Sequence, residues 1–338
     1  MKKYISIVAA MVLMLFSLSA CNHQESETTT EPSRKEEAQS EKIQIVTTIF
    51  PEYDWVKQIL GEDAENAEVT LLLDTGVDLH SYQPTAEDIL KISGCDLFLY
   101  VGGESDEWVE DALNNPSNEN RKVVNLLEVL GDAAKEEEMV EGMEEGEDHE
   151  EDGEEEEEGP EYDEHVWLSL KNARIFCEAI EKELAELCPE KAEQYEENKK
   201  NYEEKLEALD GKFRETVDAA SNKTLLFGDR FPFRYLTEDY GLSYYAAFVG
   251  CSAETEASFQ TVTFLSGKVD ELNLSTVLIL EKSDGKIAKT IVENTQKKDQ
   301  KIVSMDSMQS VTAAEVEEGV SYLSIMEKNL DAMKAALE

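Results

Sequence analysis

Eight short apolar runs, each followed by a stretch with helical periodicity, constrain the fold of this 338-residue chain most strongly. They lie at residues 43–49, 68–74, 95–101, 122–127, 224–229, 243–249, 276–281 and 301–306. Runs this apolar that alternate with helices are typical of parallel strands covered on both faces. The pattern therefore predicts an α/β protein with two lobes, each with a mostly parallel sheet flanked by helices.

The segment 165–220 lies between the two groups of strands and is rich in Glu, Lys, Ala and Leu. The residue before a proline avoids helical geometry, so we expect one helix to end near Cys188 and another to begin at Pro189. If the second helix reaches about Val217, it is roughly 43 Å long at 1.5 Å per residue. A helix of that length is predicted to act as a stiff connector between an N-terminal lobe (42–135) and a C-terminal lobe (221–338).

The segment 136–164 is strongly acidic, since 19 of its 29 residues are Asp or Glu and none is Lys or Arg. Self-repulsion predicts that it is a disordered loop. It could collect cations weakly or serve only as a solvated linker. The formal net charge of the whole chain is −45, which argues against nucleic acid as a partner because phosphate contacts need an excess of basic residues.

The N-terminus has the composition of an export signal. Two lysines precede an apolar run and the residues "LSAC", which end at Cys21. The apolar run is shorter than the roughly 20 residues that cross a bilayer, which favours a cleaved signal over a membrane-spanning anchor. We expect residues 1–20 to be a signal peptide, Cys21 to be lipidated, and residues 21–41 to be a flexible tether. The mature protein is then an extracytoplasmic lipoprotein anchored to the cell membrane.

Four further cysteines are present, at positions 95, 177, 188 and 251. Cys177 and Cys188 lie on one predicted helical stretch, about 16 Å apart, and cannot bridge each other there. None of the cysteines has C-x-x-C spacing, so a thiolate metal site has little support. Buried free thiols are the expected state, although other pairings stay open.

Polar residues follow several strands of the predicted sheets. Asp229, Glu281 and Asp306 each end a strand of the second lobe, and His80 follows a strand of the first. Ligands of open α/β sheets bind beyond the carboxyl ends of the strands. Each acid alone could instead cap a helix. Together with His165, which follows the acidic segment, these residues form a nitrogen and oxygen donor set suited to zinc, manganese or iron.

Several motifs, in this order, resemble those of the metal-binding lipoproteins of bacterial ABC transporters, the zinc and manganese solute-binding proteins. They are "LHSYQPTAEDI" (79–89), "YVGGESDEWVEDAL" (100–113), "YDEHVWLSL" (162–170), "FRYLTEDYGL" (233–242) and "SAETEASFQTV" (252–262). The resemblance covers almost all of the chain after the tether. It implies two α/β lobes joined by a long rigid helix, with one metal ion between them.

The resemblance also implies a ligand set. It assigns His80 and His165 from the first lobe and Asp306 from the second. The family's third ligand falls on Arg230, whose guanidinium cannot coordinate a cation, and the neighbouring Asp229 is the expected substitute. Possible additional ligands, which could complete the shell, are Glu254, Glu256 and Glu281.

The implied function is capture of a divalent metal and its delivery to an ABC permease and ATPase, by a protein that is a monomer and not an enzyme. Zinc is the favoured ion and manganese the alternative, since carboxylates suit manganese but zinc binds such sites more tightly. A manganese or iron binding protein of the same type and a metal-dependent adhesin are alternatives. A metallohydrolase is least favoured, because the chain has no H-E-x-x-H motif.

Overall fold

The computed structural model describes residues 42–114, 116–144, 161–252 and 256–338 of the chain. Residues 42–338 form one compact unit. The predicted signal peptide, the lipidation site Cys21 and the tether therefore lie outside the described residues. Within the described residues, no helix combines the length and the apolar composition that a bilayer span requires.

The first lobe contains a four-stranded parallel sheet in the order β2-β1-β3-β4. Its strands are β1 (Ile43–Thr47), β2 (Ala67–Leu71), β3 (Leu97–Tyr100) and β4 (Lys122–Asn125). The helices that follow them in turn are α1 (Phe50–Leu60), α2 (Ala86–Gly94), α3 (Trp108–Leu113) and α4 (Leu126–Leu130). Most residues of the central strands β1 and β3 are buried, as expected for strands covered on both faces.

The second lobe repeats this design, with a four-stranded parallel sheet in the order β6-β5-β7-β8. Its strands are β5 (Thr224–Phe231), β6 (Ser243–Val249), β7 (Thr276–Leu280) and β8 (Lys301–Met305). Its helices are α7 (Arg234–Tyr240), α8 (Phe259–Glu271), α9 (Lys286–Asn294), α10 (Ala313–Glu317) and α11 (Tyr322–Leu337). The predicted fold class, two lobes with parallel sheets flanked by helices, is confirmed.

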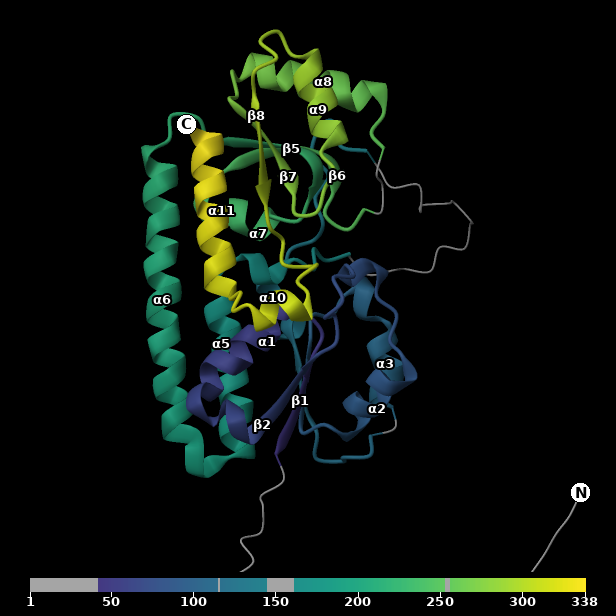
Figure 1. Cartoon of the computed structure of the whole chain (residues 1–338), viewed down its shortest axis with the longest axis vertical. Coiled ribbons are helices and arrows are strands. Elements are labelled where there is room, and N and C mark those ends of the chain that lie inside the picture. The colour runs from purple at the N-terminus through teal and green to yellow at the C-terminus, as the bar shows by residue number, and fades with distance from the viewer. Residues whose placement is uncertain (1–41, 115, 145–160, 253–255) are drawn as a thin grey trace, which may run out of the picture. The chain divides into compact units, whose positions relative to one another are not determined.

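Two long helices connect the lobes. The first, α5 (Leu170–Leu187), ends at Cys188, and a short turn at Pro189–Lys191 leads into α6 (Ala192–Ala219), as the proline predicts. The 28 residues of α6 span roughly 42 Å. Figure 1 shows α6 running beside α5 in its first half and beside α11 in its second. One continuous helix therefore packs against elements at both ends of the molecule.

Buried polar contacts fix α6 against the first lobe. The hydroxyl of Tyr195 donates to Asp63 at 2.7 Å, and the hydroxyl of Tyr202 donates to Asp54 at 3.3 Å. Both tyrosine rings are fully or almost fully buried. Because each contact joins residues far apart in the chain, the helix is held as a rigid support rather than as a mobile linker.

The main apolar core is continuous from the first lobe into the second. Trp167 is completely buried, and its indole Nε1 donates to the backbone oxygen of Ser307, after β8, at 2.8 Å. The hydroxyl of Tyr322, at the start of α11, donates to the backbone oxygen of Trp167 at 2.7 Å. These contacts hold the segment that carries His165 against the loop after β8.

The two flanks of the acidic segment are paired, not disordered. The backbone N–H of Glu137 donates to the oxygen of Glu161 at 2.9 Å, and that of Glu144 donates to Ala247 of β6 at 3.0 Å. The prediction of disorder over the whole of 136–164 is therefore wrong for residues 136–144 and 161–164. Backbone pairing with its own opposite flank and with β6 outweighs the charge repulsion there. Residues 145–160 lie outside the described part of the chain.

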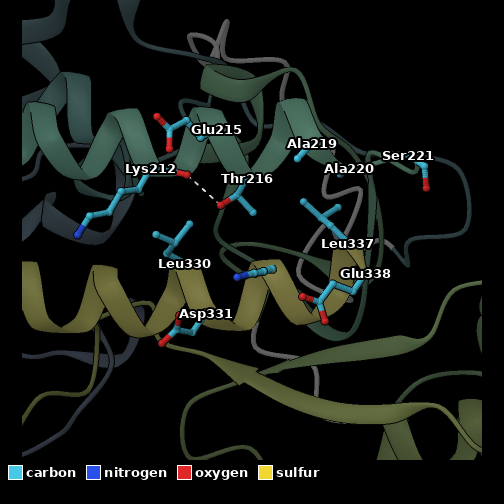
Figure 2. Close-up of a pocket in the computed structure, with 11 residues that line it drawn as sticks. Lys212, Glu215, Thr216, Ala219, Ala220, Ser221, Leu330, Asp331, Leu337 and Glu338 are labelled. Atoms are coloured by element: carbon cyan, nitrogen blue, oxygen red, sulfur yellow. Dashed lines mark hydrogen bonds between the residues drawn. The ribbon is translucent and has the colours of Figure 1, made fainter.

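A surface hollow lies between the C-terminal halves of α6 and α11 (Figure 2). Lys212, Thr216, Leu330 and Leu337 are among the residues that line it. The hydroxyl of Thr216 is used within α6, where it donates to the backbone oxygen of Lys212 at 2.9 Å. None of the lining residues is among the metal ligands predicted from the sequence.

Candidate metal site

His80 is presented by a tight turn, Leu79–Ser81, in the loop that follows β2. Asp78 caps this turn, since its Oδ1 accepts the backbone N–H of His80 at 3.1 Å. On the imidazole ring, Nδ1 lies 2.7 Å from Ser105 Oγ and 3.4 Å from Glu164 Oε2. With Nδ1 engaged on this side, the other ring nitrogen, Nε2, is left to face a ligand.

His165 is completely buried at the turn before α5. Asp163 Oδ1 accepts both the backbone N–H of His165 and its ring Nδ1–H, each at 2.9 Å. The carboxylate therefore places the proton on Nδ1 and leaves a lone pair on Nε2. This is the arrangement by which carboxylates orient metal-binding histidines in many proteins.

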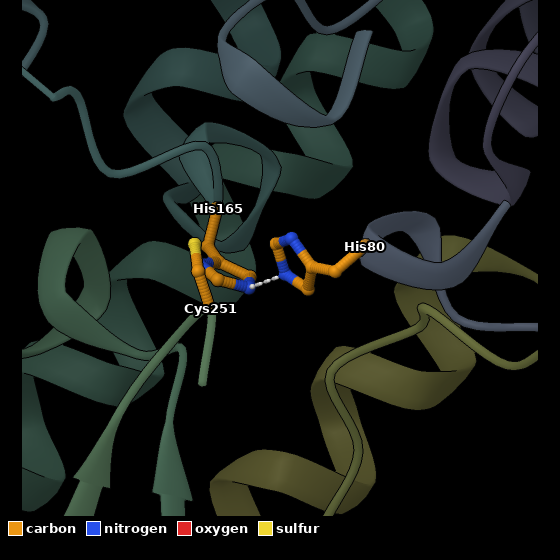
Figure 3. A group of neighbouring side chains, drawn as sticks. All are labelled: His80, His165 and Cys251. Carbon is orange, nitrogen blue, oxygen red and sulfur yellow. Dashed lines mark hydrogen bonds between the residues drawn. The ribbon is translucent and has the colours of Figure 1, made fainter. Parts of the chain in front are cut away.

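The two Nε2 atoms face each other, with His80 Nε2 and His165 Nε2 only 3.2 Å apart (Figure 3). Two zinc–nitrogen bonds of about 2.05 Å at a tetrahedral angle place the nitrogens about 3.3 Å apart. The observed separation is therefore close to what a shared metal ion requires. The structure brings together the two histidines that the sequence selected.

Cys251 also contributes to this group. One ligand atom from each of His80, His165 and Cys251 lies within 4.8 Å of the others. Gly250 permits the approach, because a Cβ atom at this position would lie only 2.9 Å from His165 Cε1. The absence of C-x-x-C spacing in the sequence lends little support to a thiolate site. In the structure, however, the fold brings the Cys251 thiol close to the two histidines. The one signal in the sequence is its position just after the end of β6.

Gln309 reaches the same point from the loop after β8. Its side chain is buried, and its Nε2 lies 3.1 Å from His165 Nε2, to which it donates. Within the described part of the chain, its Oε1 is buried without a hydrogen-bond partner. Gln309 was not predicted from the sequence, because nothing in the sequence distinguishes a metal-binding glutamine in a polar loop from any other glutamine.

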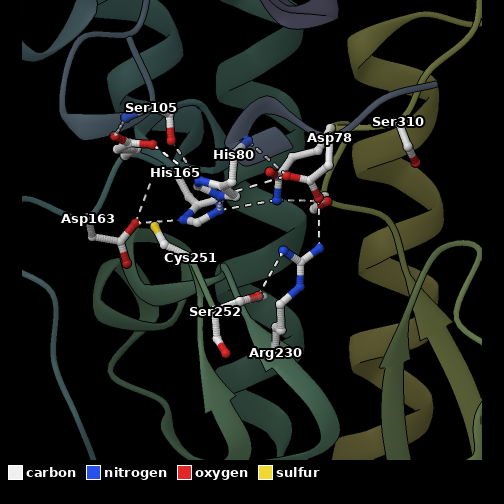
Figure 4. A network of polar contacts seen from close by, with 12 residues as sticks. Asp78, His80, Ser105, Asp163, His165, Arg230, Cys251, Ser252 and Ser310 are labelled. Carbon is white, nitrogen blue, oxygen red and sulfur yellow. Dashed lines mark hydrogen bonds and ion pairs between the residues drawn. The ribbon is translucent and has the colours of Figure 1, made fainter. Parts of the chain in front are cut away.

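Arg230, on which the resemblance places the family's third ligand, is engaged in other contacts (Figure 4). Its guanidinium donates to Asp78 Oδ2 at 2.7 Å and to the backbone oxygen of Ser252 at 3.3 Å. Burial alone would raise the pKa of Asp78, but Arg230 and His80 outweigh it and hold that pKa below its usual value. Arg230 therefore ties the loop of His80 to the loop of Cys251.

The strand-end carboxylates stabilise the second lobe instead of joining the group. Asp229 accepts the backbone N–H groups of Arg230 at 2.9 Å and of Leu280 at 3.3 Å. Asp306 accepts the backbone N–H of Met308 at 2.8 Å. Among the described residues, neither acid belongs to the group of donor atoms around the histidines. The structure therefore does not support Asp229 or Asp306 as ligands in this arrangement.

The remaining acidic candidates are also absent from the donor group. Glu281 accepts the backbone N–H and the hydroxyl of Ser307, and burial together with Asp306 raises the pKa of Glu281 to about 7. Glu256 is exposed, and Glu254 lies outside the described residues. Glu281 and Asp306 directly follow β7 and β8, whereas Asp229 lies within β5, two residues before its end. All three acids accept backbone N–H groups there.

Carboxylates around the first-lobe histidine give the site a negative field. Glu164 Oε1 accepts the backbone N–H of Ser105 at 2.8 Å, and Gly103 leaves the space that this carboxylate fills. Burial would raise the pKa of Glu164, but contact with His80 lowers it overall. Such a field favours a cation between the two imidazoles.

Comparison with known proteins gives a consistent result. The family model described as zinc-uptake complex component A, periplasmic, matches residues 45–336. The high-affinity zinc uptake system protein ZnuA of Bacillus subtilis is 32% identical over 301 residues, which cover 89% of each chain. The zinc-binding lipoprotein AdcA of Streptococcus pneumoniae serotype 4 is 31% identical over 332 residues. The aligned region covers 98% of this chain and 60% of AdcA.

The fold agrees with the sequence match. The crystal structure of the Zn(II)-bound ZnuA-like domain of Streptococcus pneumoniae AdcA superposes with a TM-score of 0.67 at 29% identity. The superposition covers 88% of this chain and 99% of that domain. The chain spans about 60% of the length of the AdcA relatives that it matches. By its match over residues 45–336 and its likeness to the Bacillus subtilis protein, the chain belongs to the ZnuA family of zinc-uptake components.

Proposed function

We propose that this protein captures one Zn²⁺ ion between His80 and His165 outside the cytoplasm and delivers it to an ABC permease and its ATPase. The 3.2 Å separation of the two Nε2 atoms is the observation that supports this most directly. Both Nδ1 atoms are engaged by hydroxyl or carboxylate groups, so the rings are oriented before the metal arrives. The zinc-bound state of the AdcA domain supports zinc as the ion.

Membrane anchoring is part of the proposal. The apolar N-terminal run that ends in "LSAC" supports lipidation of Cys21 and an extracytoplasmic location. The family description, a periplasmic component of a zinc-uptake complex, supports the same side of the membrane. A monomer tethered by lipid would hold its site close to the permease.

Zinc binding couples the site to the arrangement of the lobes. His80 and His165 belong to the first-lobe side, whereas the loops after β6 and β8 bring second-lobe groups against His165. An ion bound at this junction stabilises the arrangement in which the lobes meet. A permease that recognises this arrangement would distinguish the loaded protein from the empty one.

The environment of the histidines favours capture over hydrolysis. A zinc hydrolase needs a general base beside a metal-bound water. Here Asp163 accepts two bonds from His165, and Glu164 accepts from Ser105 and lies 3.4 Å from His80 Nδ1. A third nearby carboxylate, Asp78, has its Oδ1 4.0 Å from His80 Nε2 and accepts from the His80 backbone N–H and from Arg230. These three carboxylates are therefore used to hold the imidazoles and the turn that carries His80.

Calorimetric titration with zinc, and separately with manganese, tests the proposal. We expect one tight zinc site in the wild-type chain that is lost in the His80→Ala, His165→Ala double variant. A His149→Ala variant, which removes the histidine of the acidic segment, serves as the matched control and should bind as the wild type does. Tight binding that survives the double variant would contradict the proposed site, and preference for manganese would contradict the proposed ion.

A further inference from the structure

We propose that Cys251 Sγ and Gln309 Oε1, both from the second lobe, complete a four-donor site with His80 Nε2 and His165 Nε2. This rests on the proposed function and specifies its ligand chemistry. The set of two nitrogens, one sulfur and one oxygen would bind Zn²⁺ tetrahedrally. A thiolate would then take the place of the third family ligand, which Arg230 cannot supply.

The geometry around Cys251 supports a sulfur ligand. A tetrahedral ion with a zinc–sulfur bond of about 2.3 Å and a zinc–nitrogen bond of about 2.05 Å needs a sulfur–nitrogen separation of about 3.6 Å. The donor atoms of His80, His165 and Cys251 already lie within 4.8 Å of one another. A movement of about 1 Å therefore closes the shell. Binding would release the thiol proton to solvent, since the thiolate is the ligand.

The loop that carries Cys251 is built to hold the thiol there. Gly250 packs directly against the His165 ring, where a Cβ atom would clash. The backbone N–H of Cys251 donates to Glu137 Oε1 at 3.3 Å, and the next residue, Ser252, accepts from Arg230. Figure 4 shows the Cys251 thiol between Asp163, the two imidazoles and Arg230. Arg230 is thus a residue that positions the Cys251 loop, and it is not a ligand.

Gln309 supplies the second, independent observation. Its side chain is 2% exposed, and its buried Oε1 has no hydrogen-bond partner within the described residues. A half-turn of the amide exchanges Oε1 with Nε2, which lies 3.1 Å from His165 Nε2. This separation is close to the distance between two donor atoms that bind one tetrahedral zinc ion. Metal binding would thereby give the buried Oε1 a partner, which it lacks within the described residues.

This ligand set predicts selectivity. Thiolates suit soft and borderline ions such as zinc, whereas manganese prefers carboxylate, carbonyl and water oxygens. A site with one thiolate and no carboxylate ligand should therefore bind zinc in strong preference to manganese. The nearby carboxylates Asp163 and Glu164 would act through the histidines instead, and Asp78 through the His80 turn and Arg230.

Cobalt(II) substitution tests the sulfur ligand, because cobalt thiolate bonds give an intense charge-transfer band in the near ultraviolet. We expect the band in the full wild-type chain and in Cys188→Ser, a matched control at another partly exposed free cysteine. Cys251→Ser should lose the band and bind zinc more than about 100-fold more weakly, since loss of a ligand exceeds the 10- to 100-fold effect of an outer partner. Cys251→His should bind zinc tightly without the band.

Two further measurements separate the possible failures. X-ray absorption at the zinc edge of the wild-type protein should detect one sulfur at about 2.3 Å, and its absence would overturn the inference whatever the variants do. Gln309→Leu should weaken zinc binding without removing the cobalt band. If Cys251→Ser binds zinc as the wild type does while the His80→Ala, His165→Ala variant does not, the thiolate ligand is wrong and the proposed function stands. If zinc binding survives loss of both histidines, the proposed function itself is wrong.

Discussion

At the scale of single residues, Asp163 determines which nitrogen of His165 faces the site. Its Oδ1 accepts the ring Nδ1–H at 2.9 Å while also accepting the backbone N–H of the same residue. A negative charge at this position selects the tautomer and orients the ring. The residue is 2% exposed, so the interaction is little screened by solvent.

We therefore expect Asp163→Asn to weaken zinc binding by roughly 10- to 100-fold, because outer-shell partners of metal ligands have effects of this size. Asp132→Asn, at an exposed position, is the matched control and should leave the affinity unchanged. Calorimetry on both variants measures the difference. Equal affinities in the two variants would show that His165 is oriented by other groups.

Glu52, at the start of α1, gives a prediction about stability and pH. Burial and the nearby Asp106 raise its pKa from 4.5 to about 8. The folded protein therefore binds a proton at this residue that the unfolded chain releases above pH 4.5. Its contribution to the free energy of unfolding is full below pH 4.5 and is lost as the pH rises toward 8.

Glu52→Gln should remove this part of the pH dependence. The Oε2 of Glu52 accepts the N–H groups of Thr48 and Ile49, which a glutamine oxygen can also accept, while Oε1 has no partner among the described residues. We expect the variant to be more stable than the wild type at pH 8 and to show a smaller loss of stability between pH 5 and pH 8. Urea unfolding at several pH values measures this, and parallel pH profiles would contradict the assigned protonation.

At the scale of elements, the loop after β6 approaches His165 only because Gly250 has no side chain. A Cβ atom there would lie 2.9 Å from His165 Cε1 and 3.0 Å from the backbone oxygen of Phe231. Gly250→Ala should therefore displace the loop, lowering both the zinc affinity and the melting temperature.

The matched control is Gly267→Ala within α8, where a Cβ atom would meet nothing within 4 Å. This variant should keep the wild-type affinity and raise the free energy of unfolding by about 0.5–1 kcal/mol, the usual gain for alanine over glycine in a helix. Thermal melts and zinc titrations of both variants make the comparison. An unchanged affinity in Gly250→Ala would show that the loop does not need its close approach.

The elements themselves could be predicted well from sequence. The apolar runs mark all eight strands, and Pro189 marks the boundary between α5 and α6, because these features act through local backbone geometry. The flanks of the acidic segment could not be predicted, since their pairing partners include β6, about 100 residues further along the chain.

The site was only partly predictable for the same reason. His80 and His165 stand out as two of only four histidines. The strand-end acids Asp229 and Asp306 satisfy backbone amides, a demand that spacing alone does not reveal. Cys251 and Gln309 reach His165 only through the meeting of the two lobes. The position of Cys251 just after β6 is the one local signal, and Gln309 has none.

At the scale of the whole molecule, the site lies close to several hydrogen bonds that join segments distant in the sequence. Trp167 is joined to the loop after β8, Tyr322 of α11 is joined to Trp167, and Arg230 of β5 is joined to Asp78 beside His80. The long helix α6 packs against elements at both ends of the molecule. These contacts favour small movements of the lobes around a bound ion over wide opening at a hinge.

The most direct test of the central claim is a crystal structure of the zinc-loaded protein with anomalous diffraction recorded at the zinc edge. The account predicts one strong anomalous peak between His80 Nε2 and His165 Nε2, at about 2.0–2.1 Å from each. A peak elsewhere, or no peak between the two imidazoles in a protein that is loaded with zinc, would contradict it.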